Sequence, residues 1–361
     1  MRKLSVLLLC TLLCPVLLWG CTGQSADEYA GETITELKEG DPSAFSRLLD
    51  AGLEESGADF VIQCPEEVKE PYLKFLQDAF ASIEFEVASA SERSDGVYSV
   101  PITYTPIDLA QTVGSANEET AADPPSADFT ETMLAVLEAD TKLVADDPVY
   151  GAETTTDLTV SRTDDGFSVA EEDLQSFLVS VLSGYMTPYD TFGALYDMQD
   201  FLTSYLDASF KGEVAQFALH TDRTEDEAYE WYLADTFDPP ADLSQAYVAR
   251  YQAAMQNLLK QSSYTVGTPR LEPGLFSYQI DVTITPNNSL ADAYHEFEQG
   301  TYYSIDEASE ALVAALEKYA AAPTYGAETT LTVPVNMETL TTADQEGSDM
   351  ATLATTILPS P

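Results

Sequence analysis

Basic residues are scarce in this chain of 361 residues, which has 15 Lys+Arg against 62 Asp+Glu and a formal net charge of −47. Nucleic acids and anionic lipid surfaces are bound through Lys and Arg, so we expect no nucleic-acid partner. The acidity is that of a solvated surface, or it recruits cations or a basic partner. Hydrophobic residues still make up 45% of the chain and aromatic residues 10%. A folded body is therefore expected, and its length favours two domains.

Residues and motifs for catalysis are equally sparse. The sequence has no Gly-x-Ser-x-Gly turn, no Gly-rich phosphate loop, no His-Glu-x-x-His pair and no spaced calcium loop. Its two histidines, His220 and His295, have no counterparts elsewhere in the chain, although His295-Glu296-Phe297-Glu298 could place an imidazole and a carboxylate one helical turn apart for acid–base work. We interpret His295 as a polar helix position, and we predict neither a cofactor nor a metal site.

A candidate acidic stripe is formed by Asp222, Asp226 and Glu230, which follow one another at helical spacing. Such a stripe is usually a solvated helix face and only rarely a cation site. We therefore predict a solvated face here.

The first twenty residues have the parts of an export signal. Arg2 and Lys3 precede an apolar run from Leu4 to Leu18, which is shorter than a spanning helix and has no second charged flank. The following Leu18-Trp19-Gly20-Cys21 resembles the lipobox of bacterial lipoproteins, which implies a diacylglycerol on Cys21 and cleavage before it. Two acyl chains would hold the protein stably on a membrane. The alternative is an ordinary signal peptide that contains cysteine.

Removal of such a signal leaves little cysteine and even less positive charge. Two of the basic residues and none of the acidic ones lie in residues 1–20, so the remainder has 13 basic against 62 acidic residues, a net charge of −49. Cys10 and Cys14 would leave with the signal and Cys21 would carry the lipid. Cys64 is then the single free thiol, which excludes an internal disulfide or a cysteine metal site. We interpret Cys64 as a small core residue.

An eight-residue motif occurs twice. Pro148-Val-Tyr-Gly-Ala-Glu-Thr-Thr155 returns 175 residues later as Pro323-Thr-Tyr-Gly-Ala-Glu-Thr-Thr330, with seven matches. The same offset aligns two apolar helix faces, which step by three or four residues: Pro65, Val68, Tyr72, Leu76, Phe80 and Ile83 with Pro240, Leu243, Tyr247, Tyr251, Met255 and Leu258. The chain is therefore predicted to be an internal duplication.

Two alternating segments support the duplication. Apolar residues alternate with polar ones over 98–104 and 278–284, and each segment is followed directly by Thr-Pro. This period of two predicts strands with one buried face. The offset between these two segments is 180, so the second hairpin is five residues longer than the first. We expect the first copy to have five additional residues in a loop from Gly114 to Ser126, which restores the offset of 175.

These patterns predict an α+β body with four segments. Residues 1–20 form the signal peptide, 21–29 a tether, 30–186 the first α+β module and 187–361 the second. Helices at 33–53, 65–82 and 129–145 accompany a hairpin at 83–107 and a strand at 154–161. A turn at 164–166 leads to a short strand through Phe167 and Val169, and a further helix begins at Leu174. The break signals at 183–190 mark the boundary between the modules, and Met350, Leu353 and Ile357 mark the final helix.

This element order, together with the Tyr98–Pro106 strand, resembles the cystatin-like and NTF2-like α+β superfamily. The chain is most similar to the duplicated lipoproteins of uncharacterised function that Gram-positive gut bacteria export. The resemblance implies two tandem modules with helices packed on curved antiparallel sheets. It also implies a cone-shaped cavity, which serves as an active site in some members and is filled in others, so that fold alone does not decide function.

Tyrosine is unevenly distributed, since fifteen of the 20 tyrosines lie between Tyr185 and Tyr325. Tyrosine and tryptophan are common at recognition surfaces, so Tyr229, Trp231 and Tyr232 are candidate binding residues. The alternative is that tyrosine fills the core of the second copy. We expect a non-enzymatic binding or scaffolding lipoprotein on the extracytoplasmic face of the cell membrane. Its partner would be an envelope protein, a peptide or a glycan; the alternative is an NTF2-like hydrolase or isomerase.

Overall fold

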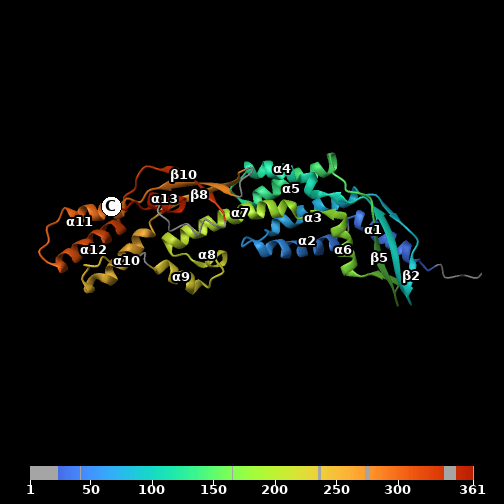
Figure 1. Ribbon diagram of the computed structural model, residues 1–361, viewed down its shortest axis with the longest axis horizontal. Helices are drawn as coiled ribbons and strands as arrows, with labels where there is room; N and C mark the ends of the chain where they lie inside the picture. The colour runs from blue at the N-terminus through green and yellow to red at the C-terminus, as the bar shows by residue number, and fades with distance from the viewer. Residues whose placement is uncertain are drawn as a thin grey trace, which may run out of the picture.

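The chain is an α+β protein with an elongated body (Figure 1). The computed structural model describes residues 23–40, 42–164, 166–234, 237–272, 277–336 and 347–360. The predicted signal and Cys21 therefore lie outside the described residues. We call residues 23–186 the first half and residues 187–360 the second half.

The first half contains six α-helices, a short 3-10 helix and seven strands among its described residues. In chain order they are α1 (Ala26–Lys38), α2 (Pro42–Ser56), η1 (Gly57–Asp59), α3 (Glu66–Ala81), β1 (Phe85–Val87), β2 (Ser91–Ser94), β3 (Val97–Tyr104), β4 (Ile107–Asp108), α4 (Leu109–Ala122), α5 (Phe129–Asp146), β5 (Thr154–Thr163), β6 (Gly166–Val169), α6 (Glu171–Val181) and β7 (Leu182–Ser183).

The second half is richer in helix. Its described elements are α7 (Thr187–Leu206), the π-helix η2 (Asp207–Lys211), α8 (Ala215–His220), α9 (Glu225–Leu233), the 3-10 helix η3 (Gln245–Tyr247), α10 (Val248–Leu259), β8 (Ser263–Leu271), β9 (Tyr278–Thr285), α11 (Ser289–Glu298), α12 (Ile305–Ala321), β10 (Thr329–Val335) and α13 (Asp349–Ile357).

Two curled antiparallel sheets carry the same pairing register. In the first sheet, of order β1-β3-β5-β6 with β2 also on β3, Ile102 pairs with Thr156. In the second, of order β10-β9-β8, Val282 pairs with Leu331. These pairs are related by the offsets read from the sequence, 180 for the central strand and 175 for the return strand. The repeated motif therefore places the return strand identically in both halves.

The helix alignment from the sequence is one turn out of place. Burial in α3 at Tyr72, Phe75 and Leu76 is matched in α10 by Tyr251, Ala254 and Met255, an offset of 179 instead of 175. A helix face recurs after about four residues, so both offsets fit the apolar pattern. The second helix accordingly begins at Val248, eight residues after Pro240.

Two more boundaries differ from the prediction. Most of the expected loop 114–126 belongs to α4, because Asp108 caps this helix and Val113, Asn117 and Ala121 form its buried face. The expected tether also contains the first turn of α1, which begins at Ala26 behind a capping box between Ser25 and Glu28.

Helix α7 joins the two hydrophobic cores. Its first part, including Tyr189, Phe192 and Tyr196, packs in the core of the first half, and its second part, from Met198 to Leu206, packs in the second core. The turn before it requires Gly184, which has φ 71° and would place an added Cβ 2.7 Å from the Cβ of Ala110. The predicted boundary at residue 187 thus coincides with the start of a helix that both cores share.

Candidate binding cleft

An aromatic cleft of about 690 Å³ lies in the second half, between the end of α7, α9, α10 and α13. Its described lining consists of uncharged side chains: Tyr205, Ser209, Phe210, Trp231, Tyr232, Ala234, Met255, Leu259, Leu290, Ala354, Thr355, Leu358 and Ser360. This volume falls within the usual range of small-molecule sites. An uncharged cleft stands out in so acidic a chain.

Trp231 forms one wall of the cleft. The N-cap Thr224 starts α9 through a capping box with Glu227, and this sets the helix turn on which Trp231 lies. The indole ring packs on Phe217, with ring centroids 4.6 Å apart, and on Tyr205 at 6.0 Å. Its exposure is intermediate, so one part of the ring packs in the core while another remains accessible.

Tyr232 is 3% exposed and lines the cleft next to Trp231. Its ring meets Phe237 edge-on at 5.0 Å, and Gly212 allows this close packing, since an added Cβ there would lie 2.8 Å from the Tyr232 ring. Burial raises the pKa of the Tyr232 phenol, with a smaller contribution from Tyr229. Within the described residues its buried hydroxyl has no hydrogen-bond partner, which is uncommon in a native core.

The floor of the cleft includes a π-turn. Ser209 and Phe210 belong to η2, which Lys211 and Tyr264 support by binding the Asp207 carboxylate, each at 2.7 Å. Single π-turns are rare and occur frequently at functional sites. This turn, at the end of α7, places Ser209 and Phe210 in the lining of the cleft.

The three candidate residues do not act as one surface. Trp231 and Tyr232 line the cleft, whereas Tyr229 is 45% exposed and does not line it. The tyrosine skew also has a partly structural cause, because Tyr185, Tyr189 and Tyr196 pack in the first core. Two of the three candidates therefore line the cleft, and a binding role for them stays a prediction.

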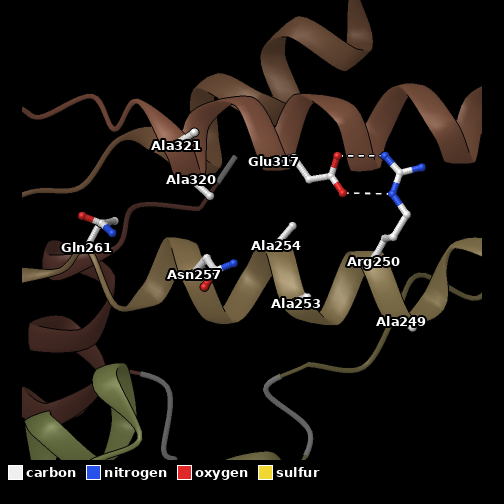
Figure 2. Close-up of a pocket in the computed structure, with 9 residues that line it drawn as sticks. All are labelled: Ala249, Arg250, Ala253, Ala254, Asn257, Gln261, Glu317, Ala320 and Ala321. Atoms are coloured by element: carbon white, nitrogen blue, oxygen red, sulfur yellow. Dashed lines mark hydrogen bonds and ion pairs between the residues drawn. The ribbon is translucent and has the colours of Figure 1, made fainter.

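A second groove, of about 470 Å³, lies between α10 and α12 (Figure 2). Ala249, Ala253, Ala320 and other small residues line it, and a paired hydrogen bond from Arg250 to Glu317, at 2.9 and 2.8 Å, bridges the two helices. The corresponding groove between α3 and α5 measures about 870 Å³. Both grooves follow the seam of a packed helix pair, and the aromatic lining of the cleft is absent from their described residues.

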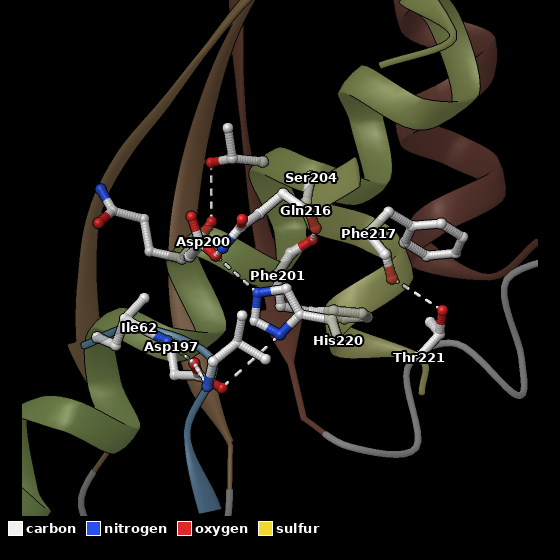
Figure 3. A network of polar contacts seen from close by, with 12 residues as sticks. Ile62, Asp197, Asp200, Phe201, Ser204, Gln216, Phe217, His220 and Thr221 are labelled. Atoms are coloured by element: carbon white, nitrogen blue, oxygen red, sulfur yellow. Dashed lines mark hydrogen bonds and ion pairs between the residues drawn. The ribbon is translucent and has the colours of Figure 1, made fainter. Parts of the chain in front are cut away.

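His220 joins a buried polar network at the junction of the halves (Figure 3). Its Nε2 lies 2.7 Å from Asp200 and its Nδ1 3.8 Å from Asp197. Asp197 also accepts the backbone N–H groups of Val61 and Ile62, at 2.7 and 3.1 Å. Burial raises the pKa of Asp197, and these N–H bonds and His220 oppose the shift. The network therefore ties a loop of the first half to α7 and α8.

Asp140 is a second buried acid, on α5 of the first half. The amide of Asn117, assigned with its nitrogen toward the carboxyl, donates to it at 3.0 and 3.3 Å. Burial raises the pKa of Asp140 to about 7, although the Asn117 bond lowers it. Asp140 lies in the first half, whereas the aromatic cleft lies in the second.

The candidate acidic residues Asp222, Asp226 and Glu230 are all exposed, as predicted for a solvated face. Asp222 lies outside α9 in a turn with φ 51°, whereas Asp226 and Glu230 lie on that helix. No group of three acidic, histidine or cysteine side chains within the described ranges is suited to a metal ion. His295 is exposed on α11, and its neighbour Glu296 pairs with Lys318.

Cys64 is a half-buried thiol packed against the first core. Burial raises its pKa to about 11, which disfavours the reactive thiolate.

No family model, curated protein or solved structure matches this chain. Among the residues that the structure describes, no helix is both long and apolar enough to cross a bilayer.

Proposed function

We propose that the protein is a lipid-anchored extracytoplasmic binding protein that takes a neutral ligand with an apolar or aromatic face into the cleft around Trp231. The uncharged aromatic cleft in the second half carries this proposal. Aromatic rings supply broad contact area, and the hydroxyls of Ser209, Thr355 and Ser360 supply a few polar contacts for orientation. A neutral peptide segment and a sugar ring are both of this class.

The space between the sheet and the helices of the first half is filled, which favours the second half as the binding site. Side chains fill that space themselves, with Phe85 and Tyr104 from the sheet meeting Phe80 and Phe177 from the helices at ring distances of 5.0 to 5.9 Å. A cone filled by its own aromatics supports a packing role for that sheet, which favours a binding protein over an NTF2-like enzyme with its site there.

The proposed anchor fits the shape of the body. Helix α1 lies toward one end of the molecule, whereas α9 and α13 lie in the opposite half (Figure 1). A lipid on Cys21 would hold the first end at the membrane and leave the cleft away from the bilayer.

Tryptophan fluorescence tests the cleft, because Trp19 leaves with the signal and Trp231 is then the single tryptophan. Titration with N-phenyl-1-naphthylamine, a neutral aromatic probe, should quench Trp231 by energy transfer and saturate. Ala354→Asp adds a charge to the cleft wall and should weaken probe binding about tenfold, since burial of an unpaired charge is costly. Ala351→Asp, on the same helix but outside the cleft, is the matched control.

Unchanged probe affinity in Ala354→Asp would place the probe elsewhere and refute the site. Absence of saturable quenching in the processed chain would also refute it.

A further inference from the structure

Helices α5 and α12 begin in the same way. Each follows an N-cap whose side chain accepts an N–H three residues on: Asp128 from Glu131 at 2.9 Å and Ser304 from Glu307 at 3.2 Å. The two N-caps are 176 residues apart. The same offset relates buried positions later in the two helices, since Val136 and Leu137 match Leu312 and Val313. Phe129 and Ile305 therefore occupy the same first position in the two helices.

In the first half this position lies under α7. The ring of Phe129 lies 6.4 Å from that of Tyr189 and 5.4 Å from that of Tyr196. The loop before α5 is contacted as well, since Tyr196 donates to the carbonyl of Ser126 and Gln199 donates to that of Ala127 at 3.3 Å. Helix α7 thus packs on the start of α5, where Phe129 is half-buried, and holds the loop before it by two hydrogen bonds.

In the second half the matching residues are exposed. Ile305 is 62% exposed where Phe129 is half-buried, and Tyr303 is 88% exposed at the position of the smaller Ala127, which is exposed as well. Beside them the ring of Tyr302 stacks on Phe297 at 5.0 Å and 10°. We call Phe297, Tyr302, Tyr303 and Ile305 the tip surface, because the α11–α12 loop forms the end of the body opposite α1 (Figure 1).

The charge around the tip surface indicates the sign of a partner. Glu298, Asp306, Glu307 and Glu310 are exposed there, and the nearby Lys318 is already paired with Glu296. An acidic rim attracts a basic partner and repels an acidic one.

We propose that the tip surface binds an amphipathic, basic α-helix of another protein, in the manner in which α7 covers the equivalent face of the first half. Its apolar side would meet Tyr303 and Ile305, and its basic side would face the acidic rim. This proposal is independent of the cleft, because none of the tip residues lines it.

A peptide based on α7 provides the probe. It has the sequence of residues 187–199 with Asp190→Lys and Asp197→Lys and carries fluorescein. Its anisotropy is measured against the full lipoprotein in nanodiscs of neutral phosphatidylcholine. We expect saturable binding that Tyr303→Ser/Ile305→Ser weakens about tenfold. Leu219→Ser, at a residue of α8 that is also 62% exposed, should leave the affinity unchanged.

The unaltered acidic peptide should bind several-fold more weakly, and added salt should weaken the basic peptide. Equal affinity of the double variant and the parent chain would overturn the proposal, as would equal affinity for both peptides. Dimerisation of the detergent-solubilised chain that the double variant abolishes would assign the surface to a second copy, and this too would overturn it. Both substituted residues are exposed, so an unchanged circular dichroism melt should accompany the variant.

Discussion

The two halves of this chain share a sheet register but differ in what their helices cover. At the start of α5 in the first half, Phe129 is half-buried and packs on Tyr189 and Tyr196 of α7. In the second half, the start of α12 is open, and an aromatic cleft has formed beside α9 instead. The two sheets have matching strand register, whereas the surfaces of the helices around them differ.

The largest expected effect concerns the proposed lipid anchor, Cys21, which precedes the first half. Cys21→Ala removes the thiol that would carry the lipid, so labelling with an alkyne fatty acid should be lost completely. The chain should then be released or remain unprocessed. Label that persists in the variant would show that the protein is not anchored through Cys21, and the division into a membrane end and a free end would fail.

A core substitution tests whether the halves are energetically separate. Phe80 is fully buried among the aromatics of the first core, so Phe80→Ala should destabilise that half by about 3–5 kcal/mol. Circular dichroism during urea unfolding should show the loss. Trp231 fluorescence, which reports on the second half, should shift much less, because no neighbour of Phe80 in the ring contacts belongs to the second core.

Coincident shifts of both signals in Phe80→Ala would contradict this separation. They would show that α7 couples the two cores into one cooperative unit.

Asp140 gives the first half a pH dependence. Its pKa is raised to about 7 in the folded chain, so its protonated form favours folding at low pH and this stability is lost as pH rises through 7. Above that pH, Asp140→Asn should be more stable than the parent by on the order of 4 kcal/mol or less, and the gain should vanish near pH 4. Urea unfolding at pH 5 and 8 measures it.

The matching position in α12 is Leu316, which is buried and does not titrate. The second-half signal from Trp231 should therefore be insensitive to Asp140→Asn. A pH-independent difference between Asp140→Asn and the parent would show that the acid is ionised at every pH tested.

The smallest expected effect is at the junction. Asp197→Ala leaves the N–H groups of Val61 and Ile62 without their acceptor and should cost about 1–3 kcal/mol. Asp197→Asn keeps an oxygen at that place and should cost less, which makes it the control. Equal losses in the two variants would show that the carboxylate charge, and not the acceptor, holds the loop to α7.

Several elements followed directly from local patterns. The alternation over 98–104 and 278–284 predicted β3 and β9, and the repeated motif placed β5 and β10 in matching register. The helix offset was wrong by one turn, because an apolar face looks alike after a turn. The extended loop at 114–126 was wrong as well: its small and acidic residues concealed the buried face of α4.

The sequence by itself determined the α+β class and the main strands of both sheets, because these depend on residues close in the chain or on the repeated motif. Export and lipidation through Cys21 stay predictions. Only the tertiary structure decided which aromatics are buried and which are free. Phe129 and Ile305 occupy the same helical position and differ because α7 covers one and not the other. Burial is set by the neighbour that covers a side chain, and that neighbour comes from a distant part of the chain. The cleft and the tip surface could therefore be located only in the folded protein.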